Sequence, residues 1–294
     1  MSSTAYQSAL VSDRERERLV AIGARAVMPG LVRVRVAAIR AYRSGGNVAG
    51  AILSGIDAAI RPVVHDAMLA AYMRGRLRSF LNAETAMGRT LALANPYASA
   101  VKLLQGRLNL TDDALAAISA EYGRQAASVT GELGSMVERK VSEAIAQATA
   151  DNLHTRAGTL RVREAFDAAG ITPANDFVPQ TLFRTQTQFA YSAARWQANQ
   201  EAAIDDILWG YEYVAIDDDR TTPLCADLNG TRRRKNDPFW SRYQPPNHWN
   251  CRSTTIEIYT GDREARTTTI PAVDAPQEGF NFNPGAVVPE LVGV

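Results

Sequence analysis

The sequence predicts an α+β protein in three parts: an elongated, mostly helical N-terminal region, a small α+β module with short antiparallel strands, and an extended C-terminal tail. Apolar residues recur at helical spacing through most of residues 1–177. Short runs of β-branched and aromatic residues follow within residues 178–260. Residues 261–294 are rich in Pro, Gly and Asn and show no periodic pattern, which is typical of an extended tail.

Composition excludes several classes of protein. Of the 294 residues, 46% are hydrophobic and 21% are charged, so the chain can bury a core and is not disordered throughout. No run of about 18 apolar residues appears, so we expect no transmembrane helix and no membrane partner. We expect no secretory signal and no disulfide-built scaffold, because the first residues lack an apolar segment and there are only 2 cysteines. These features predict a soluble protein of a reducing compartment.

The charge is balanced overall but uneven along the chain. Net charge is +1, yet residues 1–46 hold eight arginines and three acids, whereas residues 111–151 hold seven acids and three bases. The arginine-rich segment could meet phosphate or an acidic protein surface. A solvated helix face is the alternative, and we favour it because charge runs usually face solvent.

The helical pattern predicts several separate helices. Asp13 is a plausible N-cap for a helix to about Val27, with Pro29-Gly30 as its stop. A second helix over residues 31–43 ends at Ser44-Gly45-Gly46. In residues 48–87, Pro62 should kink or divide the helix.

The next predicted helices carry no evident chemistry. Asn95-Pro96 marks a turn, and Thr111 caps a helix to about Asn152 that Gly131 or Gly134 could interrupt. A further helix spans about residues 156–168. His65 and His154 have no second ligand at metal spacing, so we expect both to be packing or surface residues.

The last part of the pattern predicts one helix and two strands. The helix covers residues 180–206, and the strands cover residues 208–216 and 253–259. Between the strands lies a stretch full of turn residues, which we expect to be irregular.

Pairing of the two strands could bring Cys225, His248 and Cys251 together. These are three possible zinc ligands, with an aspartate as the fourth. The alternative, which we expect, is two buried free thiols beside a hydrogen-bonded histidine. A Cys225–Cys251 disulfide is less favoured in a reducing compartment.

Two charged runs flank this site. Asp217-Asp218-Asp219 could bind a cation, but such a run more often caps a turn and pairs with arginines, and we predict that Arg184 pairs with it. A second run is basic and precedes two aromatic residues, so it could bind DNA phosphates or be a solvated hairpin tip. It consists of Arg232, Arg233, Arg234 and Lys235.

The ordered motifs resemble those of the minor head, or head morphogenesis, proteins of tailed bacteriophages of the phage Mu F type. The resemblance runs from Thr181 to Tyr259: a helix with Arg184-Thr185, a strand, D-D-R-T-x-P-x-C-x-x-L-x-G ending at Gly230, and P-P-x-H-x-x-C-R ending at Arg252. Residues 279–285 (GFNFNPG) resemble the aromatic Asn-Pro-Gly ending of these proteins. The motif residues are Arg184, Thr185, Asp218, Asp219, Arg220, Thr221, Cys225, Gly230, Pro246, His248, Cys251 and Arg252.

The resemblance implies a structural protein of the virion with no catalytic residues and no required cofactor. It would be made in the cytoplasm of the host bacterium and lie in the capsid interior or at the portal vertex. Its implied partners are the portal protein, the major capsid protein or a scaffold, and packaged double-stranded DNA. Thr222 and Ser253 stand where many members of the family have a further cysteine, which argues against a four-ligand metal site.

Two other functions remain open. A metal-dependent nuclease could be built around Cys225, His248 and Cys251, although residues 178–260 hold only one histidine as a general base. A free DNA-binding protein is disfavoured by the balanced charge. For the tail, we expect mobility in the isolated chain and ordering on another subunit of the head.

Overall fold

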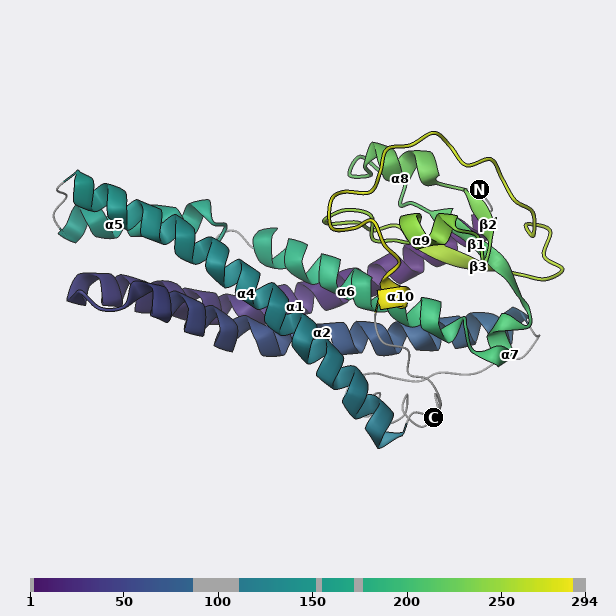
Figure 1. Cartoon of the computed structure of the whole chain (residues 1–294), viewed down its shortest axis with the longest axis horizontal. Helices are drawn as coiled ribbons and strands as arrows, with labels where there is room; N and C mark the ends of the chain where they lie inside the picture. The colour runs from purple at the N-terminus through teal and green to yellow at the C-terminus, as the bar shows by residue number, and fades with distance from the viewer. Residues whose placement is uncertain (1–2, 87–110, 152–154, 172–176, 288–294) are drawn as a thin grey trace. The chain divides into compact units, whose positions relative to one another are not determined.

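The computed structural model describes residues 3–86, 111–151, 155–171 and 177–287, and it confirms the α+β class (Figure 1). A mostly helical region is followed by a small antiparallel sheet with short helices. The elements are α1 (Ser3–Ser44), α2 (Val48–Ala86), α4 (Asp112–Ala150), α5 (Thr155–Ala168), α6 (Phe177–Ala198), α7 (Ala202–Asp205), β1 (Leu208–Val214), α8 (Pro223–Leu228), β2 (Arg232–Arg234), α9 (Phe239–Tyr243), β3 (Thr254–Tyr259) and α10 (Pro284–Val287).

The chain divides into two compact units. The sheet unit combines residues 1–19, 68–118 and 184–294, and the helical unit combines residues 20–67 and 119–183. Each unit is therefore built from segments that lie far apart in the sequence.

Neither proline ends a helix, so the predicted stop at Pro29-Gly30 and the predicted division at Pro62 are wrong. Helix α1 continues through Pro29, and α2 continues through Pro62. A proline inside a helix costs about 3 kcal/mol, because it removes one hydrogen bond and crowds the preceding turn. Close packing in the helical unit offsets this cost: a Cβ added at Gly30 would lie 2.5 Å from the Ala59 Cβ, and Ile60 is fully buried.

The predicted cap at Asp13 is also wrong, because α1 begins at Ser3, but the next helix boundaries follow the sequence. The break at Ser44-Gly45-Gly46 is confirmed, with Gly45 at a φ of 68° that favours glycine. Helix α4 starts where Thr111 accepts a hydrogen bond from the Ala114 N–H (3.2 Å), and it runs on through Gly131. Helix α5 is as predicted. The Asn95-Pro96 turn and His154 lie outside the described residues.

Length and composition alone would allow one described helix to cross a membrane. This is the stretch Val48–Ala83 of α2. The expectation that no such segment exists is therefore too strong. One such helix is weak evidence, because the core helix of a soluble protein can also meet the criterion, and 22% of the apolar window is buried within its own chain.

The sheet has three antiparallel strands in the order β2-β1-β3. Strands β1 and β3 lie where the sequence predicts them, whereas the predicted helix over residues 180–206 is divided into α6 and α7. The stretch expected to be irregular contains α8, β2 and α9. Strand β2 consists of three arginines and pairs with the central strand β1, with Arg233 opposite Tyr211. The run is a strand because of this pairing.

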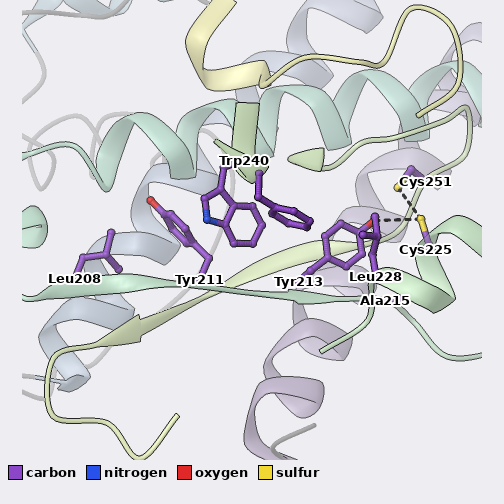
Figure 2. Close-up of a cluster of buried hydrophobic side chains, with 9 residues drawn as sticks. Leu208, Tyr211, Tyr213, Ala215, Cys225, Leu228, Trp240 and Cys251 are labelled. Atoms are coloured by element: carbon purple, nitrogen blue, oxygen red, sulfur yellow. Dashed lines mark hydrogen bonds between the residues drawn. The ribbon is translucent and has the colours of Figure 1, made fainter. Parts of the chain in front are cut away.

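The core of the sheet unit lies on the face of β1 that carries Tyr211 and Tyr213 (Figure 2). Trp240 of α9 meets Tyr211 edge to face, with ring centroids 5.4 Å apart. Trp196 of α6 stacks on Tyr211 with a centroid distance of 5.5 Å. Helix α6 therefore packs on this face of the sheet. Cys225 and Cys251 belong to the same cluster, so the core supports the candidate site directly.

Part of the described tail, residues 280–285, packs on its own chain, whereas the sequence predicted a tail that becomes ordered only on another subunit. The ring centroid of Phe282 lies 5.8 Å from that of Phe189, and Phe280 meets Trp249 edge to face at 5.5 Å. Gly285 lies against the Trp196 side chain, where a Cβ would approach to 2.5 Å. Phe280 of the tail is thus buried on its own chain, whereas Ile270 and Val287 are exposed.

Candidate functional site

Three donor side chains converge where α8 meets the loop before β3. Cys225 lies on α8, and His248 and Cys251 lie on the loop that enters β3. The Cys225 Sγ is 3.2 Å from the His248 Nε2 and 3.9 Å from the Cys251 Sγ (Figure 2 shows the two cysteines). Both cysteines are buried, at 2% and 0% exposure, and His248 is half-buried. The predicted meeting of these residues is confirmed.

The local sequence positions each donor. Pro223 occupies the first turn of α8, where its missing N–H is not needed, and so fixes the helix that presents Cys225. The His248 Nδ1 lies 2.7 Å from the Trp249 carbonyl oxygen, so Nδ1 carries a proton and donates to that oxygen. Cys251 follows Asn250, whose φ of 63° turns the chain toward β3.

Mutual contacts shift the titration of these groups. The hydrogen bond from Cys251, and then that from His248, lowers the pKa of Cys225. Burial, reinforced by the neighbouring Cys225, raises the pKa of Cys251. Burial lowers the pKa of His248, but the hydrogen bond and charge of Cys225 outweigh it and the pKa lies above its ordinary value. Cys225 therefore favours the thiolate, the form that binds metals.

The cluster has the chemistry of a soft metal site. Its three donor atoms lie within 4.8 Å of one another. Both cysteines are free, and a 3.9 Å separation is far longer than the roughly 2.05 Å of a disulfide. Within the described residues, no carboxylate joins the three donors, so the aspartate considered as a fourth ligand is not found there.

The predicted pairing of Arg184 with the acidic loop is wrong. The Arg184 guanidinium instead binds the Glu17 carboxylate (Nε to Oε1, 2.7 Å) and donates to the Asn250 Oδ1 at 2.8 Å. Arg252 takes the acidic partner, with its Nη1 2.9 Å from the Asp218 Oδ2. The two ion pairs are therefore Arg184 with Glu17 and Arg252 with Asp218. The spacing of these residues in the sequence does not show which arginine binds which acid.

The acidic loop forms a turn held by its own residues. The Arg220 N–H donates to the Asp218 Oδ1 (3.1 Å), and the Thr221 hydroxyl donates to the Ile216 carbonyl oxygen. Asp219 is exposed, and Gly230 ends the segment with a φ of 80°. Asp218 therefore serves as a turn cap and an arginine partner, which is the alternative favoured over a cation site.

Two further motif residues hold the second loop. The Thr185 hydroxyl oxygen accepts a hydrogen bond from the Asn250 N–H at 3.2 Å. The Pro245–Pro246 peptide bond is cis.

The basic run is largely neutralised by carboxylates. The Arg232 Nε lies 2.9 Å from the Glu212 Oε2, and Glu212 is buried. The remaining carboxylate pairs are Arg233 with Asp237 and Lys235 with Asp205, each at 2.7 Å. Arg234 is exposed and lies over the Trp209 ring at 5.6 Å. The run is a paired edge strand rather than a free hairpin tip.

The site's supporting residues include several that the sequence did not indicate. Glu17 reaches Arg184 from α1, 167 positions earlier in the chain. The Tyr213 hydroxyl lies 3.2 Å from the Cys225 Sγ, and the Thr222 Oγ1 lies 3.1 Å from the His248 Nε2. Of these residues, the sequence indicated only Thr222, which lies within the first loop motif.

The three-stranded sheet, the arginine on α6 and the Cys–His–Cys cluster between two loops define a small α+β module. Residues 137–256, less than half of the chain, match the family described as "Phage Mu protein F like protein". The match begins within α4, earlier than the motifs at Thr181 indicated, and it ends in β3.

Two curated relatives support the assignment as distant homologues. The "Mu-like prophage FluMu F protein" of Haemophilus influenzae is 32% identical over 99 residues, which are 34% of this chain and 23% of the relative. The "Putative capsid assembly protein F" of Escherichia phage Mu is 38% identical over 72 residues, which are 24% of this chain and 16% of the relative. The chain thus spans less than a quarter of the length of either relative. No solved structure matches it.

Proposed function

We propose that this protein is a structural minor head protein that acts in capsid assembly, or head morphogenesis, of a tailed bacteriophage. The observation that carries the proposal is the match of residues 137–256 to the Mu F-like family, one of whose curated relatives is named for capsid assembly. The matched region also contains both loop motifs and the whole Cys–His–Cys cluster, which supports the proposal.

The proposed role is structural rather than enzymatic. The Cys225 Sγ and His248 Nε2 are close enough for a nucleophile and its base, yet Cys225 is only 2% exposed and lies in the core cluster. A nucleophile needs access to its substrate. A hydrolytic nuclease would further need a general base free of the metal, and His248 is itself one of the three donors.

The proposed partners are the portal protein and the major capsid protein or a scaffold. This would place the chain in the capsid interior or at the portal vertex, after synthesis in the bacterial host. The helical unit supports a protein-contact role, because large apolar side chains are exposed on its helices. These are Ile22, Val32, Val36, Leu53 and Leu160.

Contact with packaged DNA is proposed for the basic run and centres on Arg234. It alone among the four basic residues has no carboxylate partner in the described part of the chain. One free arginine gives weak, nonspecific attraction to phosphate. DNA contact therefore depends on high local concentration inside a head.

Particle composition tests the proposal. The gene would be deleted from the phage that encodes it and supplied in trans, and heads would be purified and counted by electron microscopy. We expect deletion to lower the yield of DNA-filled heads, and the supplied chain to be present in purified heads at a fixed ratio to the portal. Normal heads without the chain, or its absence from heads made in its presence, would overturn the role.

A further inference from the structure

We infer that Cys225, His248 and Cys251 bind one zinc ion, with a water molecule as the fourth ligand. The inference rests on the geometry of these residues and not on the proposed role in capsid assembly. It assigns the cluster to zinc, where sequence reasoning favoured plain buried thiols.

The separations of the donor atoms fit a tetrahedral zinc site. Zinc binds sulfur at about 2.3 Å and imidazole nitrogen at about 2.0–2.1 Å, so two sulfurs on one ion lie about 3.8 Å apart and a sulfur and a nitrogen about 3.6 Å apart. The Cys225 Sγ lies 3.9 Å from the Cys251 Sγ and 3.2 Å from the His248 Nε2. All three donor atoms lie within 4.8 Å of one another, so a shift of about 1 Å would admit the ion.

The histidine is already oriented as a ligand. Zinc-binding histidines usually donate the N–H of the other ring nitrogen to a carbonyl or carboxylate, which fixes the ring and directs the free nitrogen to the metal. The His248 Nδ1 lies 2.7 Å from the Trp249 carbonyl oxygen, and its Nε2 is directed at the Cys225 Sγ.

The type and number of donors select zinc. Thiolate and imidazole together favour zinc over calcium or magnesium, which take oxygen ligands. Two thiolates balance the charge of a divalent ion, so the loaded site is neutral where Cys225 and Cys251 are buried.

The fourth position lies toward Thr222. The Thr222 Oγ1 is 3.1 Å from the His248 Nε2, and both residues line a small cavity that also borders Asn250 and Ser253. The cavity has room for about one water molecule, which would complete the tetrahedron. The ion would then tie α8 to the loop that enters β3.

Metal analysis of the full chain is the first test. Protein purified without chelator and dialysed against micromolar zinc should retain about one equivalent, and Cys225→Ser and Cys251→Ser should each retain less than a tenth of that amount. Tyr213→Phe is the matched control, because it removes a hydroxyl 3.2 Å from the Cys225 Sγ but no donor. It should keep the ion. Wild-type protein without zinc after dialysis would overturn the inference.

Cobalt substitution keeps the test independent of whether the serine variants fold. Cobalt(II) in the wild-type site should give the near-ultraviolet charge-transfer absorption of thiolate–cobalt bonds and the visible bands of tetrahedral coordination. Bands of an octahedral ion without thiolate absorption would contradict the assignment.

Thr222→Cys tests the fourth position by a gain of affinity. A sulfur placed where the Thr222 Oγ1 lies would replace the water, so this variant should hold zinc at least tenfold more tightly in competition with a chromogenic chelator. Thr222→Ser is its control and should bind like the wild type. Equal affinity of the cysteine variant and the wild type would overturn the placement of the fourth ligand.

Discussion

Arg195 of α6 and Glu257 of β3 form an ion pair inside the sheet unit, with side-chain exposures of only 3% and 1%. The Arg195 Nε lies 3.1 Å from the Glu257 Oε1. The same carboxylate accepts hydrogen bonds from the Asn199 Nδ2 at 3.1 Å and from the Asn82 Nδ2 at 2.9 Å. Because its acceptor sites are satisfied, the charge of Glu257 is tolerated in the core, and the pair joins α2, α6 and β3.

Removing one member of this pair should be strongly destabilising. Glu257→Ala leaves the Arg195 charge buried without its partner, and we expect a loss of about 3–5 kcal/mol in the free energy of unfolding. Chemical denaturation monitored by tryptophan fluorescence measures it. Asp57→Ala is the control, because Asp57 and Arg61 form an exposed pair on α2 and should contribute at most about 1 kcal/mol. Equal losses for both variants would contradict the assigned burial.

A double-mutant cycle should show which arginine is coupled to the acidic loop. We expect a coupling of about 0.5–1.5 kcal/mol between Arg252 and Asp218, and a coupling near zero between Arg184 and Asp218. Arg184→Ala alone should cost about 1–2 kcal/mol, because its partner Glu17 is one-third exposed and solvent weakens the pair. Stronger coupling of Arg184 than of Arg252 to Asp218 would favour the pairing predicted from sequence.

Stability should fall on acidification. Hydrogen bonding from Arg252 lowers the pKa of Asp218 below its ordinary value. A carboxyl group whose pKa is depressed by folding contributes stability above its unfolded pKa, and this stability is lost as pH falls through the folded value. The free energy of unfolding should therefore decrease below about pH 4.

Asp218→Asn should make this pH dependence less steep, as denaturant titrations at several pH values would show. Asp13 acts in the opposite direction, because burial raises its pKa, so Asp13→Asn should not flatten the curve. An unchanged slope for Asp218→Asn would show that the Arg252 contact is not formed in solution.

The tail should contribute to the stability of the isolated protein. Phe280 is 8% exposed and packs against Trp249, so Phe280→Ala should cost about 2–4 kcal/mol and lower the melting temperature. Ile270→Ala, at a position 43% exposed, is the control and should change stability by less than about 0.5 kcal/mol. A melting temperature unaffected by Phe280→Ala would restore the earlier expectation of a mobile tail.

The sequence predicted those parts of the fold that depend on local signals. The cap at Thr111, the break at Gly45 and the aromatic run of β1 act within a few residues, and the structure has each element where they predict it. Pro29 was misread because its effect depends on packing against residues near Ala59, which no local pattern reveals. Strand β2 was missed because its three arginines become a strand only through pairing with β1.

The candidate site was predictable in its chemistry but not in its partners. The spacing of Cys225, His248 and Cys251 around two strands was sufficient to bring them together. The choice of Glu17 rather than the acidic loop as the partner of Arg184 required a helix from the start of the chain. Long-range partners of charged residues depend on tertiary structure, and one sequence does not encode them in any local spacing.

The interleaving of the two units constrains the order in which the chain can fold during synthesis. The helical unit is complete once residue 183 has emerged from the ribosome, but Ser79 and Asn82 must wait about 175 residues for their acceptor Glu257. Until then, the segment from residue 68 onward has no finished sheet to join. The sheet unit therefore closes only after β3 has left the ribosome, and a chaperone or protease would encounter its open segments until then.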